Sequence, residues 1–325
     1  MNASAGSAAA GGVPTHSTRV VLDMDYGIDD SMATLYLTSL GTVEIVAIGT
    51  VHGNAPAVAA AANAAQVMRA AGLVVPIAIG AQRPLAQHLD IGSQVHGADG
   101  IGGMADGSTP TVSDESAAEQ LVRLARANPG ELTLLATGPL TNVALATMLD
   151  PELPNLLRSV VIMGGALRVS GNITPDAEAN IWHDPEAADL VFASFPRVTL
   201  APVDLTHAMV IDESHLARIE GAESTPLRDL VRGMLPQYLA FNLESTGTVG
   251  FPLHDPSAAI LLAKPELAAY ERVEIAVEKR GELTRGALVI DDRPYPASFG
   301  RPRVWVGRPA ATSFAEEFVS VAFGA

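Results

Sequence analysis

The chain alternates between short apolar runs and longer stretches in which apolar residues recur at helical spacing. The apolar runs predict buried strands at residues 19–25, 43–50, 76–80, 132–136 and 160–163. The stretches between them predict helices from about residue 29, over residues 55–71, and near Ser116. Ser116 and Glu119 have the spacing of a capping box, which marks the start of this last helix.

The second half of the chain predicts fewer strands and one long helix. Apolar residues form a helical stripe over residues 225–244, and this stripe is typical of core packing. Residues 271–306 predict strands joined by turns, followed by a closing helix from Ser313. Residues 1–18 have neither a basic start nor an apolar stretch, and they predict a disordered tail.

This order of elements predicts an α/β fold. Strands that are apolar on both faces and separated by helices indicate a mainly parallel central sheet flanked by helices. We expect a single domain over residues 19–325 because the pattern contains no linker or repeat. In such sheets ligands bind beyond the carboxyl ends of the strands, and candidate chemistry is sought there.

Composition narrows the function further. The formal net charge is −16, and only two of the 20 basic residues are lysines, so a nucleic-acid polymer and an anionic membrane are not expected partners. The absence of cysteine excludes disulfides, thiolate metal sites and cysteine nucleophiles. No segment predicts a membrane span or a signal peptide, so a cytoplasmic location is expected.

The densest candidate chemistry is VVLDMDYGIDD, residues 20–30, at the end of the first predicted strand. It places Asp23, Asp25, Asp29 and Asp30 within eight residues, where their charges repel one another. One acid is enough to cap the next helix, which is the plain structural explanation. Several acids at the ligand-binding edge of a sheet are better explained by a divalent cation, and calcium prefers such oxygen ligands.

Other polar segments also follow predicted strands. They are LATGPLTN at 135–142, the stretch 163–184 and FPLHDPS at 251–257. Taken singly, each has the composition of an ordinary turn or helix start.

Together these motifs resemble the inosine-uridine-preferring nucleoside hydrolase family. The motifs that carry the resemblance, in chain order, are VVLDMDYGIDD, VHGN (51–54), LATGPLTN, GNITPDAEAN (171–180) with DPEAA (184–188), VDLTH (203–207) and LHDP (253–256). The match runs from Arg19 to the end of the chain. It implies the Rossmann-like nucleoside hydrolase fold and hydrolysis of the N-glycosidic bond of purine or pyrimidine ribonucleosides.

The resemblance also implies a metal site. Asp25, Asp30, Asp255 and the backbone carbonyl of Thr137 match the residues that bind calcium (Ca2+) in the family. Asp25 would in addition be the general base, and Asn54 would orient the attacking water.

Residues around the sugar and the base are implied in the same way. Asp29, Asn172, Glu178 and Asn180 match the residues that bind the ribose hydroxyls, and Asp23 would support the metal ligands. His254 matches the residue proposed to protonate the departing base, a role that suits an imidazole. His96 matches a family loop near the base, whereas His52, His183 and His207 are interpreted as structural.

Two positions depart from the family pattern. Tyr26 replaces the usual proline after the second aspartate, and Ala179 replaces an aromatic residue in the sugar motif. The phenol of Tyr26 would lie beside a metal-bound aspartate and contact the substrate. The two changes raise the hypothesis that the pocket accepts a modified ribose.

Two other functions fit part of the pattern. Haloacid-dehalogenase-like phosphatases also carry Asp-x-Asp after a strand, but they have Thr or Val at the position of Gly27 and need a downstream lysine. A protein that binds calcium and a nucleoside or sugar without turnover is the second alternative. The resemblance further suggests a homodimer or homotetramer.

Overall fold

The structure is a computed structural model that describes residues 17–310 and 313–325. The predicted tail therefore lies outside the described residues apart from Ser17 and Thr18. Thr18 already belongs to the first strand, one residue before the predicted boundary.

Within the described residues the central sheet has eight strands in the order β3-β2-β1-β4-β5-β6-β12-β9. Their bounds are β1 Thr18–Met24, β2 Val43–Thr50, β3 Ile77–Ile79, β4 Leu132–Ala136, β5 Ser159–Met163, β6 Val198–Ala201, β9 Ala269–Glu274 and β12 Arg303–Arg308. All neighbouring strands run parallel except β9, which pairs antiparallel with β12. Two short antiparallel pairs stand apart: β7 Val210–Ile211 with β8 Phe251–Pro252, and β10 Ala276–Val277 with β11 Leu288–Val289.

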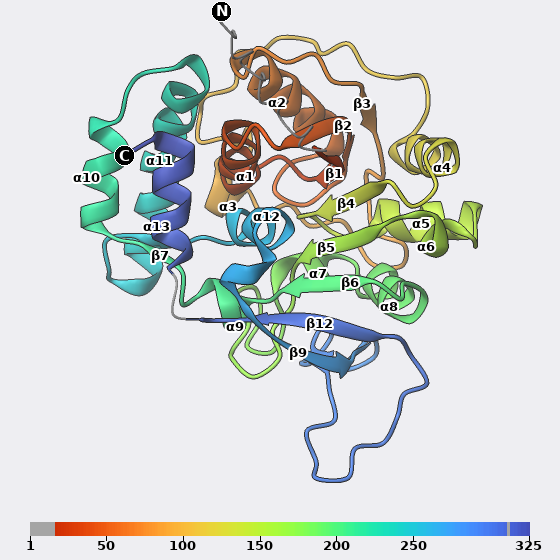
Figure 1. Ribbon diagram of the computed structural model, residues 1–325. Coiled ribbons are helices and arrows are strands. Elements are labelled where there is room, and N and C mark those ends of the chain that lie inside the picture. The colour runs from red at the N-terminus through yellow and green to blue at the C-terminus, as the bar shows by residue number, and fades with distance from the viewer. Residues whose placement is uncertain (1–16, 311–312) are drawn as a thin grey trace, which may run out of the picture.

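Helices connect the strands and cover both faces of the sheet (Figure 1). Those in the first half are α1 Ile28–Ser39, α2 Ala57–Ala70, α3 Ser93–His96, α4 Ala117–Ala127, α5 Thr141–Leu149 and α6 Leu153–Leu156. Those in the second half are α7 Ala179–His183, α8 Pro185–Ser194, α9 Val203–Thr206, α10 Glu213–Gly221, α11 Pro226–Thr246, α12 Asp255–Ala263 and α13 Phe314–Phe318. A 3-10 turn, η1 Pro265–Leu267, and a π-helical turn, η2 Val319–Phe323, complete the set.

The alternation of side chains along β1 explains why the sheet has two apolar layers. Val20 and Leu22 belong to one buried cluster, and Val21 belongs to a second cluster on the opposite face. In Figure 1, α4, α5 and α8 lie on one side of the sheet, and α1, α11, α12 and α13 lie on the other. The predicted mainly parallel sheet with helices on both faces is confirmed.

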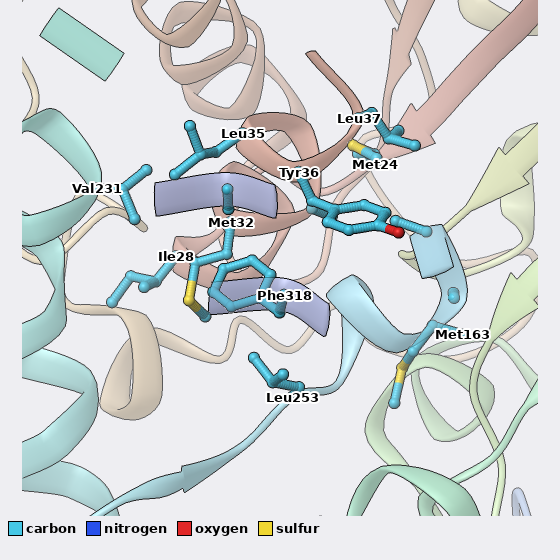
Figure 2. Close-up of a cluster of buried hydrophobic side chains, with 14 of the residues drawn as sticks. Met24, Ile28, Met32, Leu35, Tyr36, Leu37, Met163, Val231, Leu253 and Phe318 are labelled. Carbon is cyan, nitrogen blue, oxygen red and sulfur yellow. The ribbon is translucent and has the colours of Figure 1, made fainter. Parts of the chain in front are cut away.

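The cluster on the α1 side holds the start of that helix in place. Figure 2 shows Ile28, Met32 and Phe318 gathered beneath α1, with Leu253 close by. Leu253 directly precedes the His254–Asp255 pair. The same apolar cluster therefore anchors the segment after β1 and the start of α12. The core therefore fixes two acidic segments that are more than two hundred residues apart in the sequence.

Candidate active site

Three aspartates lie where β1 ends and α1 begins. Asp25 follows the strand, and Asp29 and Asp30 lie in the first turn of the helix. All three are buried. Asp30 caps its own helix, since the Gly27 amide donates to its Oδ2 at 2.7 Å. Capping therefore explains one carboxylate and leaves the others without a structural role.

Asp255, the first residue of α12, completes a cluster with Asp29 and Asp30. One carboxylate oxygen from each of the three lies within 4.8 Å of the others. Burial and the neighbouring negative charges raise the pKa of Asp255 well above its usual range. Asp29 Oδ1 and Asp255 Oδ2 are buried without a hydrogen-bond partner. Such a set of oxygens fits a hard divalent cation, which would compensate the repulsion.

Asp25 is held by one residue rather than by this cluster. The Asn54 backbone amide donates to Oδ2 at 2.7 Å, and the Asn54 side-chain amide donates to Oδ1 at 3.0 Å. Burial and the charge of Asp30 raise the pKa of Asp25 well above its usual range. Asn54 lines the adjoining cavity, whereas Asp25 lies just behind its wall.

Thr137, after the end of β4, connects the acidic cluster to the opposite wall. Its hydroxyl donates to Asp30 Oδ1 at 2.5 Å, and its carbonyl accepts from Asn180 Nδ2 at 2.8 Å. The carbonyl predicted as a metal ligand thus lies at the meeting point of the predicted metal and sugar residues.

The predicted sugar residues form that opposite wall. Glu178 is buried and accepts from the amides of Gly165 and Asn180 at 2.7 and 2.8 Å. Asn172, farther out, accepts from the Ala179 amide at 2.9 Å. Burial raises the pKa of Glu178.

Two histidines of the predicted set line the cavity. His254 pairs through Nδ1 with the Thr206 hydroxyl at 2.8 Å, and burial beside His207 lowers its pKa to about 3. His96 accepts from the Ile28 amide at 3.1 Å, and burial lowers its pKa to about 4. Both rings are therefore neutral near pH 7, and their charged forms are disfavoured.

These residues surround a cavity of about 450 Å³. Residues from the acidic cluster and the sugar wall contribute polar groups to its lining, and apolar residues such as Phe241 and Phe251 line it as well. The lining residues from the predicted set are Asp29, Asn54, His96, Thr137, Asn172, Glu178, Asn180, His254 and Asp255.

Tyr26 and Asp23 do not line the cavity. The Tyr26 ring is buried in the core, and its hydroxyl lies 3.3 Å from Thr34 Oγ1, which leaves no surface for a substrate. The prediction that Tyr26 contacts the substrate is therefore wrong. Asp23 is buried behind the cluster and accepts from Asn142 Nδ2 at 2.7 Å, a position that fits a supporting role.

Sequence reasoning missed the contribution of α11. Tyr238 donates to Asp29 Oδ2 at 3.4 Å, and Phe241 and Asn242 also line the cavity. A helix that borders a cavity shows the same apolar stripe as one buried in a core, so the pattern carried no signal. His183 and His207, interpreted as structural, line the cavity as well.

None of the helices in the described residues is long and apolar enough to cross a membrane.

Comparison with known proteins matches the chain to one family over nearly its whole length. Residues 20–320 match the family model described as inosine-uridine preferring nucleoside hydrolase. Uridine nucleosidase 1 of Arabidopsis thaliana is 36% identical, and the alignment covers 89% of this chain and 86% of that protein. The pyrimidine-specific ribonucleoside hydrolase RihA of Shewanella woodyi is 35% identical, with 84% of this chain and 88% of that protein covered.

Solved structures agree with this match. The plant nucleoside hydrolase PpNRh1 superposes with a TM-score of 0.87 at 29% identity, covering 94% of this chain and 98% of that one. A purine-preferring ribonucleoside hydrolase from Gardnerella vaginalis superposes with a TM-score of 0.82 at 25% identity, covering 94% of this chain and all of that one.

Proposed function

The chain belongs to the inosine-uridine preferring nucleoside hydrolase family, and from that membership we propose that it cleaves the N-glycosidic bond of ribonucleosides with bound calcium. The observation that carries the proposal is the buried acidic cluster of Asp29, Asp30 and Asp255 beside the cavity, in which two carboxylate oxygens have no partner. Uncompensated buried carboxylates are costly, and a cation that binds them would offset that cost.

The cluster supplies Asp30 and Asp255, and the family pattern adds Asp25 and the carbonyl of Thr137 as the groups that would hold the ion, with Asp29 beside it. Bound calcium would supply the positive charge that compensates these groups and makes a nearby water more acidic. The donors are all oxygen atoms, which suits calcium better than zinc. Asp29 lines the cavity, so its carboxylate can accept a hydrogen bond from a ribose hydroxyl.

Asp25 is the group that takes the proton from the attacking water. Both its oxygens are held in one orientation by Asn54, so the carboxylate is positioned to accept a proton. Asn54 also reaches the cavity surface, where its side chain orients the water.

Glu178, Asn172 and Asn180 bind the sugar from the opposite wall. Carboxylate and amide oxygens near the ring stabilise the positive charge that develops as the glycosidic bond breaks. His254 is neutral, so it assists the departing base by donating a hydrogen bond from Nε2 while Nδ1 is engaged by Thr206.

The base preference proposed here is for pyrimidines, because a uridine nucleosidase and a pyrimidine-specific hydrolase are 36% and 35% identical to this chain, whereas the purine-preferring hydrolase is 25% identical. A homodimer or homotetramer and a cytoplasmic location remain predictions from the sequence.

The hypothesis of a modified ribose now depends on Ala179 alone, since Ala179 lines the cavity and Tyr26 does not. Replacing Ala179 with phenylalanine should lower kcat/KM for a ribose-methylated nucleoside relative to the plain nucleoside. A change in that ratio below about twofold, equivalent to roughly 0.4 kcal/mol, would show that Ala179 does not set sugar specificity.

The test of the proposed function is to incubate the protein with uridine and with inosine and to measure free ribose. Uridine should be hydrolysed faster, and exhaustive chelation should abolish turnover until calcium is restored. Full activity after chelation, or release of phosphate from a generic phosphate ester instead of ribose, would contradict the proposal.

A further inference from the structure

Three buried side chains are joined by hydrogen bonds close to the turn that carries Asn54. His52 Nε2 lies 3.1 Å from Thr141 Oγ1, and that hydroxyl donates to Asp184 Oδ2 at 2.7 Å. His52, Thr141 and Asp184 are all almost completely buried, and none of them lines the cavity. We call these three residues the His52 relay.

The direction of each hydrogen bond in the relay follows from the chemistry of its members. A threonine hydroxyl has one hydrogen, and Thr141 gives it to Asp184. Its oxygen can then only accept from the ring of His52, so the proton of the neutral imidazole is on Nε2. Burial lowers the pKa of His52 to about 4, which keeps this neutral form near pH 7.

One end of the relay is firmly anchored. Asp184 joins α7 to α8, and its oxygens also accept from the backbone amides of Leu85 and Ala187 at 2.9 and 3.1 Å. Three donors on one carboxylate hold it in a single orientation. The sugar wall on α7 also has a contact that does not involve Thr141, since Asn180 donates to the Thr137 carbonyl.

At the other end of the relay, His52 is connected through the backbone to Asn54, which binds the proposed general base Asp25. His52 is separated from Asn54 by Gly53 alone, and a side chain at Gly53 would overlap Asp25 Oδ2. Asn54 in turn donates to both oxygens of Asp25. A rotation or shift of His52 is therefore transmitted to the only residue whose amide groups bond to Asp25 within the described part of the chain.

We propose that the His52 relay positions Asn54, and through it Asp25, so that His52, Thr141 and Asp184 are positioning residues for the hydrolysis. The inference rests on the proposed function, in which Asp25 is the base. Because the relay acts on the base and not on the sugar wall, its loss should lower kcat and leave KM nearly unchanged.

The first experiment removes the hydroxyl of Thr141 at constant shape. Thr141→Val should lower kcat for uridine about tenfold or more, since small displacements of a reacting group are costly, with KM changed less than about twofold. Thr141→Ser restores the hydroxyl and should recover most of the loss. Thr133→Val is the control, because it also removes a hydroxyl contact, the part-buried one to Ser159, near the start of β4 and outside the cavity lining.

A second pair of variants probes the relay from its other end. His52→Gln keeps an N–H that can donate to Thr141, and His52→Leu does not. The glutamine variant should retain more of kcat than the leucine variant. If circular dichroism shows that Thr141→Val does not fold, the His52 pair tests the relay instead, and equal kcat in the glutamine and leucine variants would contradict it.

A readout without turnover separates this inference from the proposed function. In nitrogen–proton NMR spectra, Thr141→Val should shift the His52 Nε2–H and Asn54 amide resonances, whereas Thr133→Val should leave them in place. If the wild type does not hydrolyse nucleosides yet these shifts occur, the proposed function fails, and only the structural link from Thr141 through His52 to Asn54 stands. An unchanged Asn54 amide, or equal kcat in the valine and serine variants, overturns the relay.

Discussion

Asp25, the proposed general base, is held in one orientation while burial changes its acidity. Both its oxygens accept from Asn54, and burial beside Asp30 raises its pKa. The hydrogen bonds favour the charged form and burial opposes it, so the carboxylate remains a usable base.

Asp25→Asn should therefore lower kcat by about two to four orders of magnitude, because an amide cannot take the proton of the water. The fold should survive, since asparagine has nearly the same shape and removes one of several repelling charges. Ribose release and the unfolding midpoint measure the two effects. Turnover above half that of the wild type would refute the assigned role.

At Tyr26 the backbone conformation decides which residues the position can hold. Its φ is +34°, a left-handed value that is unusual for any residue other than glycine. Proline, the usual residue of the family here, fixes φ near −65° and cannot adopt this conformation.

Tyr26→Pro should thus destabilise the protein by about 3 kcal/mol or more, from backbone conflict and loss of a buried ring. Tyr26→Phe is the control, since it removes only the hydroxyl contact with Thr34 and should cost about 1 kcal/mol. Urea unfolding compares the two, and equal stabilities would contradict the backbone argument.

At the scale of single elements, helix starts are set by local side chains. Ser116 accepts from the Glu119 amide at 3.3 Å, and Glu119 accepts from the Ser116 amide at 2.8 Å, which confirms the predicted capping box of α4. α4 packs against α5 and contributes no residue to the cavity.

Ser116→Ala should lower the free energy of unfolding by about 1 kcal/mol and leave kcat unchanged. Ser113→Ala, three residues earlier, removes a hydroxyl without a capping role and should change neither quantity. A loss of activity in Ser116→Ala without a change in unfolding would show that α4 reaches the site by a route other than its cap.

Strand positions could be predicted well from the sequence, and strand neighbours could not. β2 and β4 have the predicted bounds, because a buried strand needs a continuous apolar run. The four-residue β6 was missed, since so short a run resembles many buried segments. Nothing local indicated that β12 lies between β6 and β9, because that choice depends on long-range pairing.

In the site, too, residues within a local motif could be predicted and residues brought in by long-range packing could not. Acidic residues clustered in one motif, such as Asp29 and Asp30, could be predicted, and so could Asp255 through its motif. Tyr238 could not, because its place in the cavity depends on where α11 lies and not on its neighbours in sequence. The relation of Thr141 to His52 likewise arises only from the packing of α5 against the end of β2.

For the whole molecule, two groups of buried side chains make stability depend on pH in opposite directions. Burial raises the pKa of Asp23 to about 7, so the stability it contributes is full below about pH 4 and is lost as the pH rises toward 7. Burial lowers the pKa of His52 and His96 to about 4. Their contribution is full above about pH 6.5 and is lost as the pH falls toward 4.

Excess calcium should keep the carboxylates of its site ionised, which leaves His52 and His96 opposed by Asp23 alone, and the two histidines outweigh the single aspartate. Under these conditions the free energy of unfolding should fall between pH 7.5 and pH 5. His52→Gln should reduce that fall by about 2 kcal/mol, the value for one imidazole whose pKa drops from 6.5 to about 4. His88→Gln, which removes an exposed imidazole, is the control. The same pH slope in wild type and His52→Gln would contradict the argument.

The position of β12 in the sheet also constrains how the protein is made. β12 spans Arg303–Arg308 and pairs with β6, Val198–Ala201, on one side and with β9 on the other. A nascent chain emerges from the ribosome N-terminus first, so about a hundred residues must follow β6 before its free edge finds a partner. Throughout that interval the growing polypeptide exposes the unpaired edge of β6 to other molecules. A chaperone that binds during translation would protect this edge.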